Sequence, residues 1–222
     1  MSLNRAFICG LSGTVLKKKE INFLKKYKPW GIILFSRNIK NIKQTQNLIK
    51  NIKKVFKDNF YPILIDEEGG RVSRLRNFIE SSNLTANYYG NLCKYNKKKF
   101  NIYYKIYIDQ ISYLLNKLGF NINTVPVLDL KRFTSSIIGD RSYSRNGKIV
   151  SKIGRICISS FQKNNIACVI KHIPGHGVTK VDSHKKIPIV NKTTSYLFKN
   201  DFIPFKNTKS LFAMTAHIIF KK

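Results

Sequence analysis

The sequence predicts an α/β protein of the (β/α)₈ TIM-barrel type, of which about the first six βα units are present. Short apolar runs rich in β-branched residues alternate with longer helical patterns along the chain, and this alternation is typical of parallel βαβ units. Several apolar runs end in a chemically useful side chain, which favours a barrel enzyme. A dinucleotide-binding fold would carry a glycine-rich turn after the first strand, and Cys9-Gly10-Leu11-Ser12-Gly13 does not match that motif.

Strands are predicted where apolar runs are short and bounded by polar or turn-forming residues. They cover Ala6–Cys9, Gly31–Phe35, Tyr61–Asp66, Asn123–Leu128, Ala167–His172 and Leu211–His217. Helices are predicted over Lys18–Tyr27, Ile42–Phe56, Phe100–Leu118, Lys148–Lys163 and Thr194–Asn200. A closed barrel needs eight strands and typically about 250 residues. We therefore expect residues 1–222 to form a single barrel domain that is incomplete at its C-terminus, with two exposed sheet edges and poor stability or aggregation of the isolated chain.

Length and composition suit a protein with a substantial core, since 43% of the 222 residues are hydrophobic. No apolar run approaches the roughly 18 residues of a membrane span, and the first residues lack the pattern of a signal peptide. We predict a cytoplasmic monomer with no membrane partner. The four cysteines are far apart without a C-x-x-C pair, which indicates free thiols rather than a disulfide framework or a zinc site.

The formal net charge of +30 comes from 32 lysines and only nine arginines. Specific nucleic-acid sites depend on arginine for bidentate contacts, whereas these lysines are scattered in short runs. A chain rich in Lys, Asn and Ile is what AT-rich codons yield, so we interpret the charge as compositional drift and predict no specific nucleic-acid partner. A basic nucleic-acid-binding protein remains an alternative that net charge alone supports.

Three of the four histidines lie between Lys171 and His184. Histidine exchanges protons near neutral pH, so the segment suits acid/base chemistry or metal binding. Its proline and glycines rule out a regular helix, and we expect a loop. A zinc site of His172, His176 and His184 is disfavoured because Lys171 is adjacent and no glutamate lies nearby. We predict neither metal nor cofactor, and we interpret His176 as part of the loop's scaffold, bonded to backbone.

Other candidates stand at strand ends. Glu67 and Glu68 resemble a carboxylate pair, but adjacent residues at a strand end point to opposite sides, which argues against joint catalysis. Gly69-Gly70 would allow a tight turn beside a ligand. Asp129 either shapes a pocket or caps the next segment, and His217 either lines the pocket or is structural.

Six sequence blocks occur in a characteristic order: Gly31–Asn38, Ile65–Val72, Pro126–Asp129, Ile138–Tyr143, Lys171–Gly177 and Asp182–His184. In these blocks the chain resembles the bacterial β-N-acetylhexosaminidases of glycoside hydrolase family 3, cytoplasmic enzymes of peptidoglycan recycling, and the resemblance runs through nearly the whole chain. It implies removal of non-reducing N-acetylglucosamine from anhydro-muropeptides, with retention of configuration. It also implies that His184, assisted by Asp182, is the acid/base, and that the sugar-binding residues are Asp66, Arg74, Arg141, Lys171 and His172.

The sequence departs from the family pattern in two places. Val178 stands where the family usually has aspartate. The family's nucleophile is an aspartate in a Ser-Asp-Asp context on the seventh strand, and no comparable motif occurs up to Lys222. We therefore expect this chain to carry the acid/base and sugar-binding part of the site without the nucleophile. The alternative to an active hydrolase is an inactive sugar-binding remnant or one half of a split enzyme.

Overall fold

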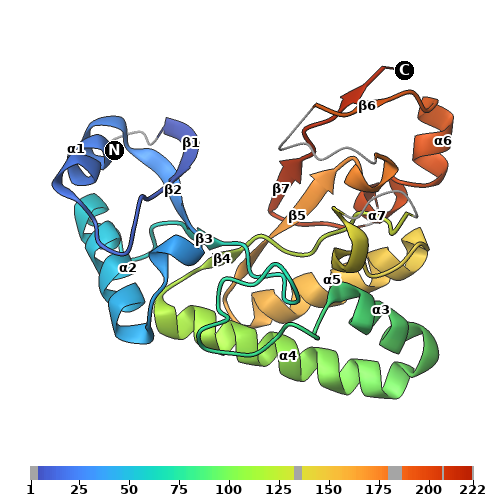
Figure 1. Cartoon of the computed structure of the whole chain (residues 1–222), viewed down its shortest axis with the longest axis horizontal. Helices are drawn as coiled ribbons and strands as arrows, with labels where there is room; N and C mark the ends of the chain where they lie inside the picture. Colours follow the sequence, from blue (N-terminus) through green and yellow to red (C-terminus); the bar gives the residue numbers. More distant parts are fainter. Residues whose placement is uncertain (1–4, 133–136, 180–186, 207, 222) are drawn as a thin grey trace.

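The computed structural model of the chain describes residues 5–132, 137–179, 187–206 and 208–221. Its centre is a parallel six-stranded sheet in the order β1-β2-β3-β4-β5-β7, so the strands follow one another across the sheet as they do along the chain (Figure 1). The strands are β1 (Arg5–Gly10), β2 (Pro29–Leu34), β3 (Ile63–Ile65), β4 (Ile122–Asn123), β5 (Ala167–Ile173) and β7 (Phe212–Thr215). This curled half-barrel confirms the predicted fold class, and each of the six predicted strands has its counterpart.

Strand β4 is shorter than predicted because side-chain bonds replace part of its backbone pairing. The amide of Asn123 accepts a hydrogen bond from the Glu67 backbone N–H at 3.0 Å and donates to the Glu67 carbonyl at 2.9 Å. Further on, Pro126 has no N–H to donate. Pairing with β5 resumes where Leu128 N–H donates to the Lys171 carbonyl at 2.8 Å.

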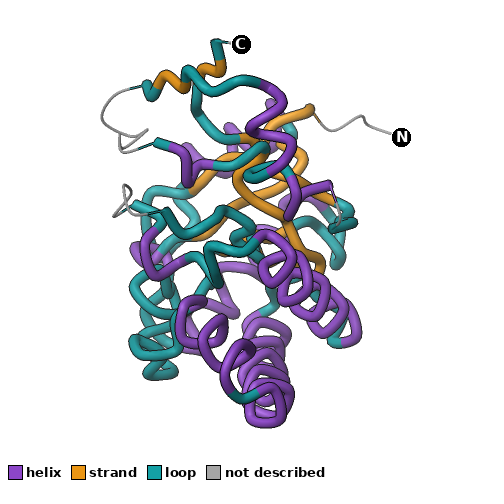
Figure 2. The backbone as a smooth tube through the Cα atoms, turned by 90° about the vertical axis from the view of Figure 1, so that its right-hand side faces the viewer, coloured by secondary structure: helices purple, strands orange, loops and turns teal. Residues whose placement is uncertain are grey.

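Helices cover the convex side of the sheet, with the strands inside and loops at the strand ends (Figure 2). Most helices begin at an Asn or Thr whose side-chain oxygen accepts a backbone N–H of the first turn, the usual N-cap; the caps are Asn41, Thr85, Asn96, Asn146 and Thr193. The helices are α1 (Lys18–Tyr27), α2 (Ile42–Phe56), α3 (Ala86–Tyr95), α4 (Lys97–Leu118), α5 (Gly147–Lys163), α6 (Thr194–Lys199) and α7 (Ile203–Lys206). Three short 3₁₀ turns are η1 (Ser36–Asn38), η2 (Gly139–Arg141) and η3 (His176–Val178).

The five predicted helices are confirmed with small changes at their ends, but three features were missed. Helices α3 and α7 were not predicted, and neither was the parallel pair of β6 (Ile189–Val190) and β8 (Ile219–Phe220). No helix within the described ranges is both long and apolar enough to cross a membrane. The four cysteines are free thiols, as predicted, and Cys157 and Cys168 are buried.

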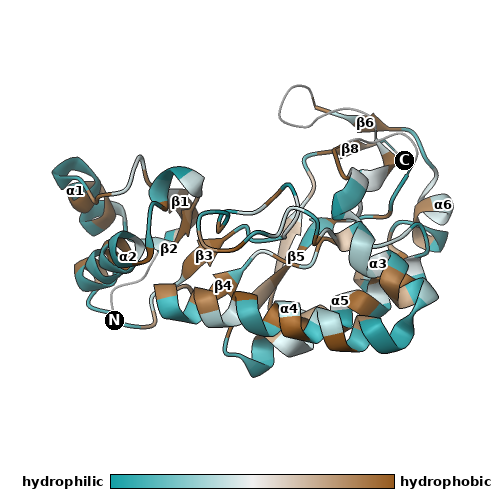
Figure 3. Ribbon diagram, turned by 60° about the horizontal axis from the view of Figure 1, so that its bottom comes forward, coloured by the Kyte–Doolittle hydropathy of each residue, from teal (hydrophilic) through white to brown (hydrophobic). Residues whose placement is uncertain are grey.

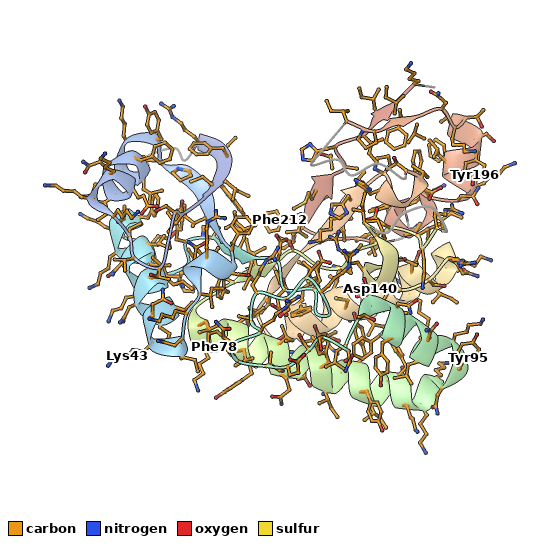
Figure 4. The ribbon with its side chains drawn as sticks, in the orientation of Figure 1. Lys43, Phe78, Tyr95, Asp140, Tyr196 and Phe212 are labelled. Carbon is orange, nitrogen blue, oxygen red and sulfur yellow. The ribbon has the colours of Figure 1, made fainter. Side chains whose placement is uncertain are left out.

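Apolar residues pack on both faces of the sheet. Strand β3 is apolar throughout, whereas the outer helices carry separate apolar and polar stripes (Figure 3). Against the helices lies the large core cluster, and inside the curve lies a smaller one around Leu64, Ile122 and Val169. The Trp30 ring of β2 lies 5.3 Å from that of Phe212 on β7, although three strands separate them in the sheet; Phe212 is labelled in Figure 4. This contact near the amino ends of the strands shows how strongly the sheet curls.

A test of the packing between α3 and the segment around η2 is Gly90→Ala. Alanine normally stabilises a helix interior relative to glycine, but here the added Cβ would overlap the Tyr143 carbonyl. We expect a net destabilisation of about 1–3 kcal/mol, measured by urea unfolding followed by circular dichroism. Gly13→Ala is the matched control because nothing lies within 4 Å of its added Cβ. Equal stability of the two variants would contradict this packing.

Candidate active site

A cavity of about 310 Å³ lies at the carboxyl ends of the strands, within the range of roughly 300–1,000 Å³ typical of small-ligand sites. All five residues predicted to bind sugar line it, and the structure therefore brings them together from β3, β5 and the connecting loops. The lining consists of Asp66, Glu68, Val72, Arg74, Ile137, Ile138, Arg141, Lys171, His172, His176, Met214, Thr215 and His217. His217 thus lies in the cavity wall, one of the two roles considered for it.

The Lys171 ammonium group occupies the centre of the polar network. Its side chain is only 2% exposed, so its charge requires compensation. The Nζ atom lies 2.6 Å from Glu68 Oε1, 3.1 Å from Asp66 Oδ1 and 3.0 Å from Thr124 Oγ1. An ammonium has three protons to donate, and these three acceptors match them. A ligand would have to share Lys171 with these partners, so its main effect is to position the two carboxylates.

Glu68 accepts a two-pronged ion pair from Arg141, with Nε to Oε2 at 2.7 Å and Nη2 to Oε1 at 2.8 Å. Burial would raise the pKa of Glu68, but the Lys171 and Arg141 cations outweigh it and lower the pKa to about 2. Glu68 is therefore a carboxylate at neutral pH. It is neither a proton donor nor a free nucleophile in this arrangement, since both of its oxygens are engaged by cations.

Asp66 is arranged differently. Oδ1 accepts from Thr124 and Lys171, whereas Oδ2 lies 3.7 Å from Arg74 Nη2, which is too long for a hydrogen bond. Burial opposes ionisation, but the charge of Lys171 and the hydrogen bond from Thr124 lower the pKa of Asp66 below its ordinary value. The Asp66 carboxylate, which can accept hydrogen bonds, therefore faces the Arg74 guanidinium, which can donate them, at 3.7 Å.

Asp129 organises the histidine segment. Its fully buried carboxylate lies 2.6 Å from His172 Nδ1 through Oδ2, and its Oδ1 accepts the His176 backbone N–H at 2.6 Å. The pairing places the Nδ1 proton of His172 against Asp129, leaving Nε2 as the atom that a ligand can address. Of the two roles considered for Asp129, the structure shows the one that shapes the pocket. His176 is buried; its backbone N–H donates to the Asp129 side chain, and its carbonyl accepts the Thr179 backbone N–H at 3.4 Å.

Glu67 and Glu68 have separate partners, as their opposite orientations predict. Glu67 Oε2 accepts the backbone N–H of Arg74 at 2.6 Å and of Leu75 at 3.0 Å, together with the Ser73 hydroxyl at 3.1 Å. Burial raises the pKa of Glu67 to about 7 in spite of these hydrogen bonds. Glu67 therefore holds the loop that presents Arg74. The preceding turn needs glycine, since Gly69 has φ +84° and an added Cβ would meet the Tyr107 hydroxyl.

Asp182 and His184, the predicted acid/base pair, lie outside the described residues. Two functional residues that sequence reasoning missed are Glu68, as the common partner of Lys171 and Arg141, and Thr124, which bridges Asp66 and Lys171. Thr124 directly follows β4 and Glu68 lies three residues after the end of β3, and these positions near strand ends are the signal that could have revealed them. Within the described ranges, no group of three or more His, Cys, Asp or Glu side chains is placed to hold a metal ion.

Comparison with known proteins places this geometry in context. The model of the glycosyl hydrolase family 3 N-terminal domain matches residues 10–222. "Beta-hexosaminidase A" of Pseudoalteromonas piscicida is 31% identical over 95% of this chain and 36% of its own length. "Beta-hexosaminidase" of Thioalkalivibrio sulfidiphilus is 29% identical over 96% of this chain and 61% of its own length.

Solved structures give the same picture. Native NagZ from Neisseria gonorrhoeae superposes with a TM-score of 0.84 at 28% identity, over 98% of this chain and 64% of that one. The same enzyme in complex with N-trifluoroacetyl-D-glucosamine gives a TM-score of 0.85 at 27% identity, over 98% and 65%. The chain thus spans between about a third and two thirds of the length of these relatives.

The pKa of Glu67 yields a prediction for stability. Because its pKa rises from 4.5 unfolded to about 7 folded, the protonated form stabilises the fold fully below pH 4.5, and this contribution is lost as the pH rises through 7. Glu67→Gln keeps an acceptor for the Arg74 and Leu75 amides but cannot titrate. We expect it to remove a decline in unfolding free energy of about 3 kcal/mol between pH 4.5 and 8, measured by urea unfolding at several pH values.

The exposed carboxylate of Glu80 offers a matched control. Glu80→Gln should retain the wild-type decline over this pH range. If Glu67→Gln also retains it, Glu67 does not titrate as the structure implies.

Proposed function

The chain belongs to glycosyl hydrolase family 3, as the match over residues 10–222 shows, and on this premise we propose that it binds a terminal N-acetylglucosamine as the sugar-recognition part of a β-N-acetylhexosaminidase. The observation that carries the proposal is the cavity in which all five expected sugar-binding residues meet. The relatives named beta-hexosaminidases and the solved complex with an N-acylglucosamine support the same assignment.

The gap between Asp66 and Arg74 suits a sugar hydroxyl. A hydroxyl both donates and accepts, so it can donate to Asp66 Oδ2 and accept from Arg74 Nη2 across their 3.7 Å separation. The ionised state of Asp66 strengthens the first of these bonds. Because the hydroxyl would bond to one negative and one positive side chain, this pair can hold a sugar that carries no charge.

The remaining polar groups would act on other parts of the sugar. His172 Nε2 can accept from or donate to a further group, since Asp129 fixes the ring through Nδ1. Arg141 is bound to Glu68 through Nε and Nη2, so its other N–H groups are the ones that could reach a sugar oxygen. Lys171 would contribute chiefly by keeping Asp66 and Glu68 ionised and in place.

For the reaction we propose the family's retaining mechanism, in two displacements through a covalent glycosyl-enzyme. His184 would serve as acid/base, and Asp182 would orient its imidazole and stabilise the charged form. The resemblance places the nucleophilic aspartate beyond residue 222. The proposed substrates are N-acetylglucosaminyl anhydro-muropeptides of peptidoglycan recycling in the cytoplasm, and residues 1–222 would form a single domain of barrel type.

Sugar binding is tested by calorimetric titration of chain 1–222 with N-acetylglucosamine. Asp66→Asn removes the charged acceptor, and we expect it to weaken binding about tenfold or more. Asp58→Asn, at an exposed carboxylate, is the matched control and should bind as the wild type does. Because Asp66 also compensates buried Lys171, Arg74→Gln gives a second variant that leaves that pair intact. Unchanged affinity in both variants would contradict the proposed site.

Turnover is tested by hydrolysis of p-nitrophenyl N-acetyl-β-D-glucosaminide. If the chain hydrolyses this substrate, His184→Ala should lower the rate by roughly 10²–10⁴-fold with a smaller change in KM, because the acid/base acts mainly in the transition state. An unchanged rate would refute the role of His184. A folded wild-type chain that binds N-acetylglucosamine without turnover would be a sugar-binding component rather than a complete hydrolase.

A further inference from the structure

A second cavity, of about 300 Å³, adjoins the sugar cavity and shares Arg74 with it. It lies at the carboxyl ends of β2 and β3, between η1 and the loop that follows Gly70. We call it the arginine cavity; its lining residues are Ser36, Ile39, Arg71, Ser73, Arg74, Arg76 and Asn77. The lining includes three arginines, two serines and one asparagine, and none of its described residues carries a carboxylate.

Nearby acids compensate these three guanidinium groups unevenly. Arg71 pairs with Asp140 at 2.8 Å, whose position is labelled in Figure 4. Arg76 Nη2 donates to the Arg71 carbonyl at 2.6 Å, a bond that satisfies a proton without neutralising the charge, and the acid near Arg76 is the fully exposed Glu80.

Arg74 is compensated by a long ion pair only. Its nearest carboxylate oxygen, on Asp66, is 3.7 Å away and belongs to an acid already paired with Lys171. The buried Nε of Arg74 has no hydrogen-bond partner among the described residues, and a buried donor without a partner destabilises the fold. An anion in the arginine cavity would provide the missing charge and accept from the terminal N–H groups of Arg74, since Nε itself is buried away from the cavity.

The composition of the chain makes this grouping informative. Lysines outnumber arginines 32 to nine, yet positions 71 to 76 hold three arginines and no lysine. A guanidinium differs from an ammonium in presenting a planar fork of donors that matches two oxygens of a carboxylate or phosphate. Glu67 fixes the loop through the backbone of Arg74 and Leu75, so these forks stand on a segment whose backbone is already ordered.

We propose that the arginine cavity binds an oxyanion, a carboxylate or a phosphate, carried by the ligand whose sugar occupies the neighbouring cavity. The link to a sugar rests on the proposed function; binding of the anion itself does not. Arg74 would contact both parts of such a ligand, with Nη2 toward the sugar hydroxyl at Asp66 and the rest of its fork toward the anion. Arg71 and Arg76 would complete the charge, and Ser36 would donate a neutral hydrogen bond, since the Ser73 hydroxyl already donates to Glu67.

The experiment is calorimetric titration of chain 1–222 at low ionic strength with inorganic phosphate, and separately with N-acetylglucosamine. Arg76→Gln removes a guanidinium that lines only the arginine cavity. It should weaken phosphate binding about tenfold while leaving binding of N-acetylglucosamine unchanged. Arg5→Gln removes the same charge at the start of β1, at the opposite end of the sheet, and should leave phosphate binding as in the wild type. Arg76→Lys, which keeps the charge but loses the fork, should fall between them.

The two titrations separate the proposals. Phosphate binding that Arg76→Gln weakens and Arg5→Gln does not would support the oxyanion site, even if N-acetylglucosamine fails to bind and the proposed function falls. Phosphate binding that is absent, or equally weakened by both substitutions, would overturn it. N-acetylglucosamine 6-phosphate and N-acetylmuramic acid then distinguish the source of the anion. If N-acetylglucosamine 6-phosphate binds more tightly than N-acetylglucosamine and Arg76→Gln removes the difference, the anion is a phosphate ester. If N-acetylmuramic acid does so instead, the anion is a carboxylate.

Discussion

The buried ammonium of Lys171 is the constraint on which the site depends. A cation that is 2% exposed is tolerated only with paired charges and hydrogen bonds, and here Asp66, Glu68 and Thr124 supply them. Those partners follow β3 and β4, whereas Lys171 lies in β5, so one ammonium joins the carboxyl ends of three neighbouring strands. Arg141 then attaches the segment before α5 through Glu68. The polar network around Lys171 therefore both lines the cavity and holds these strand ends together.

The consecutive acids Asp66, Glu67 and Glu68 lie in an extended segment, so their side chains point alternately to opposite sides and have two different roles. Asp66 and Glu68 point toward Lys171, while Glu67 between them points toward the loop that carries Arg74. Because Asn123 takes over the pairing of the Glu67 backbone, the chain can leave the sheet at this point without buried backbone groups losing their partners. Glu67 thus ends the pairing of β3 through its backbone and holds the loop that carries Arg74 through its side chain.

The alternating apolar and amphipathic segments were sufficient to predict the half-barrel, since each strand and most helices carry their own local signal. Helix α3 was missed because its apolar pattern is weak and its position depends on Gly90 packing against the Tyr143 carbonyl, a tertiary contact. Asp66, Lys171 and His172 were predicted as sugar-binding residues from the family resemblance, and they line the cavity. The pairing of Glu68 with both Lys171 and Arg141 could not be predicted, because it joins residues 103 and 73 positions apart through the curl of the sheet.

The distribution of acids explains how a chain with a net charge of +30 preserves this arrangement. Of the 11 acidic residues, four belong to the buried or largely buried polar network near the strand ends: Asp66, Glu67, Glu68 and Asp129. An exposed acid can be exchanged for lysine at little cost, because solvent and salt screen surface charges. A buried carboxylate that compensates a buried cation cannot, since removing one partner strands the other at a cost of roughly 3–5 kcal/mol. Drift toward lysine would therefore remove exposed acids more readily than these four. The four acids mark interactions that the fold depends on, and the charge excess of the surface is consistent with a sugar site without calling for a nucleic-acid partner.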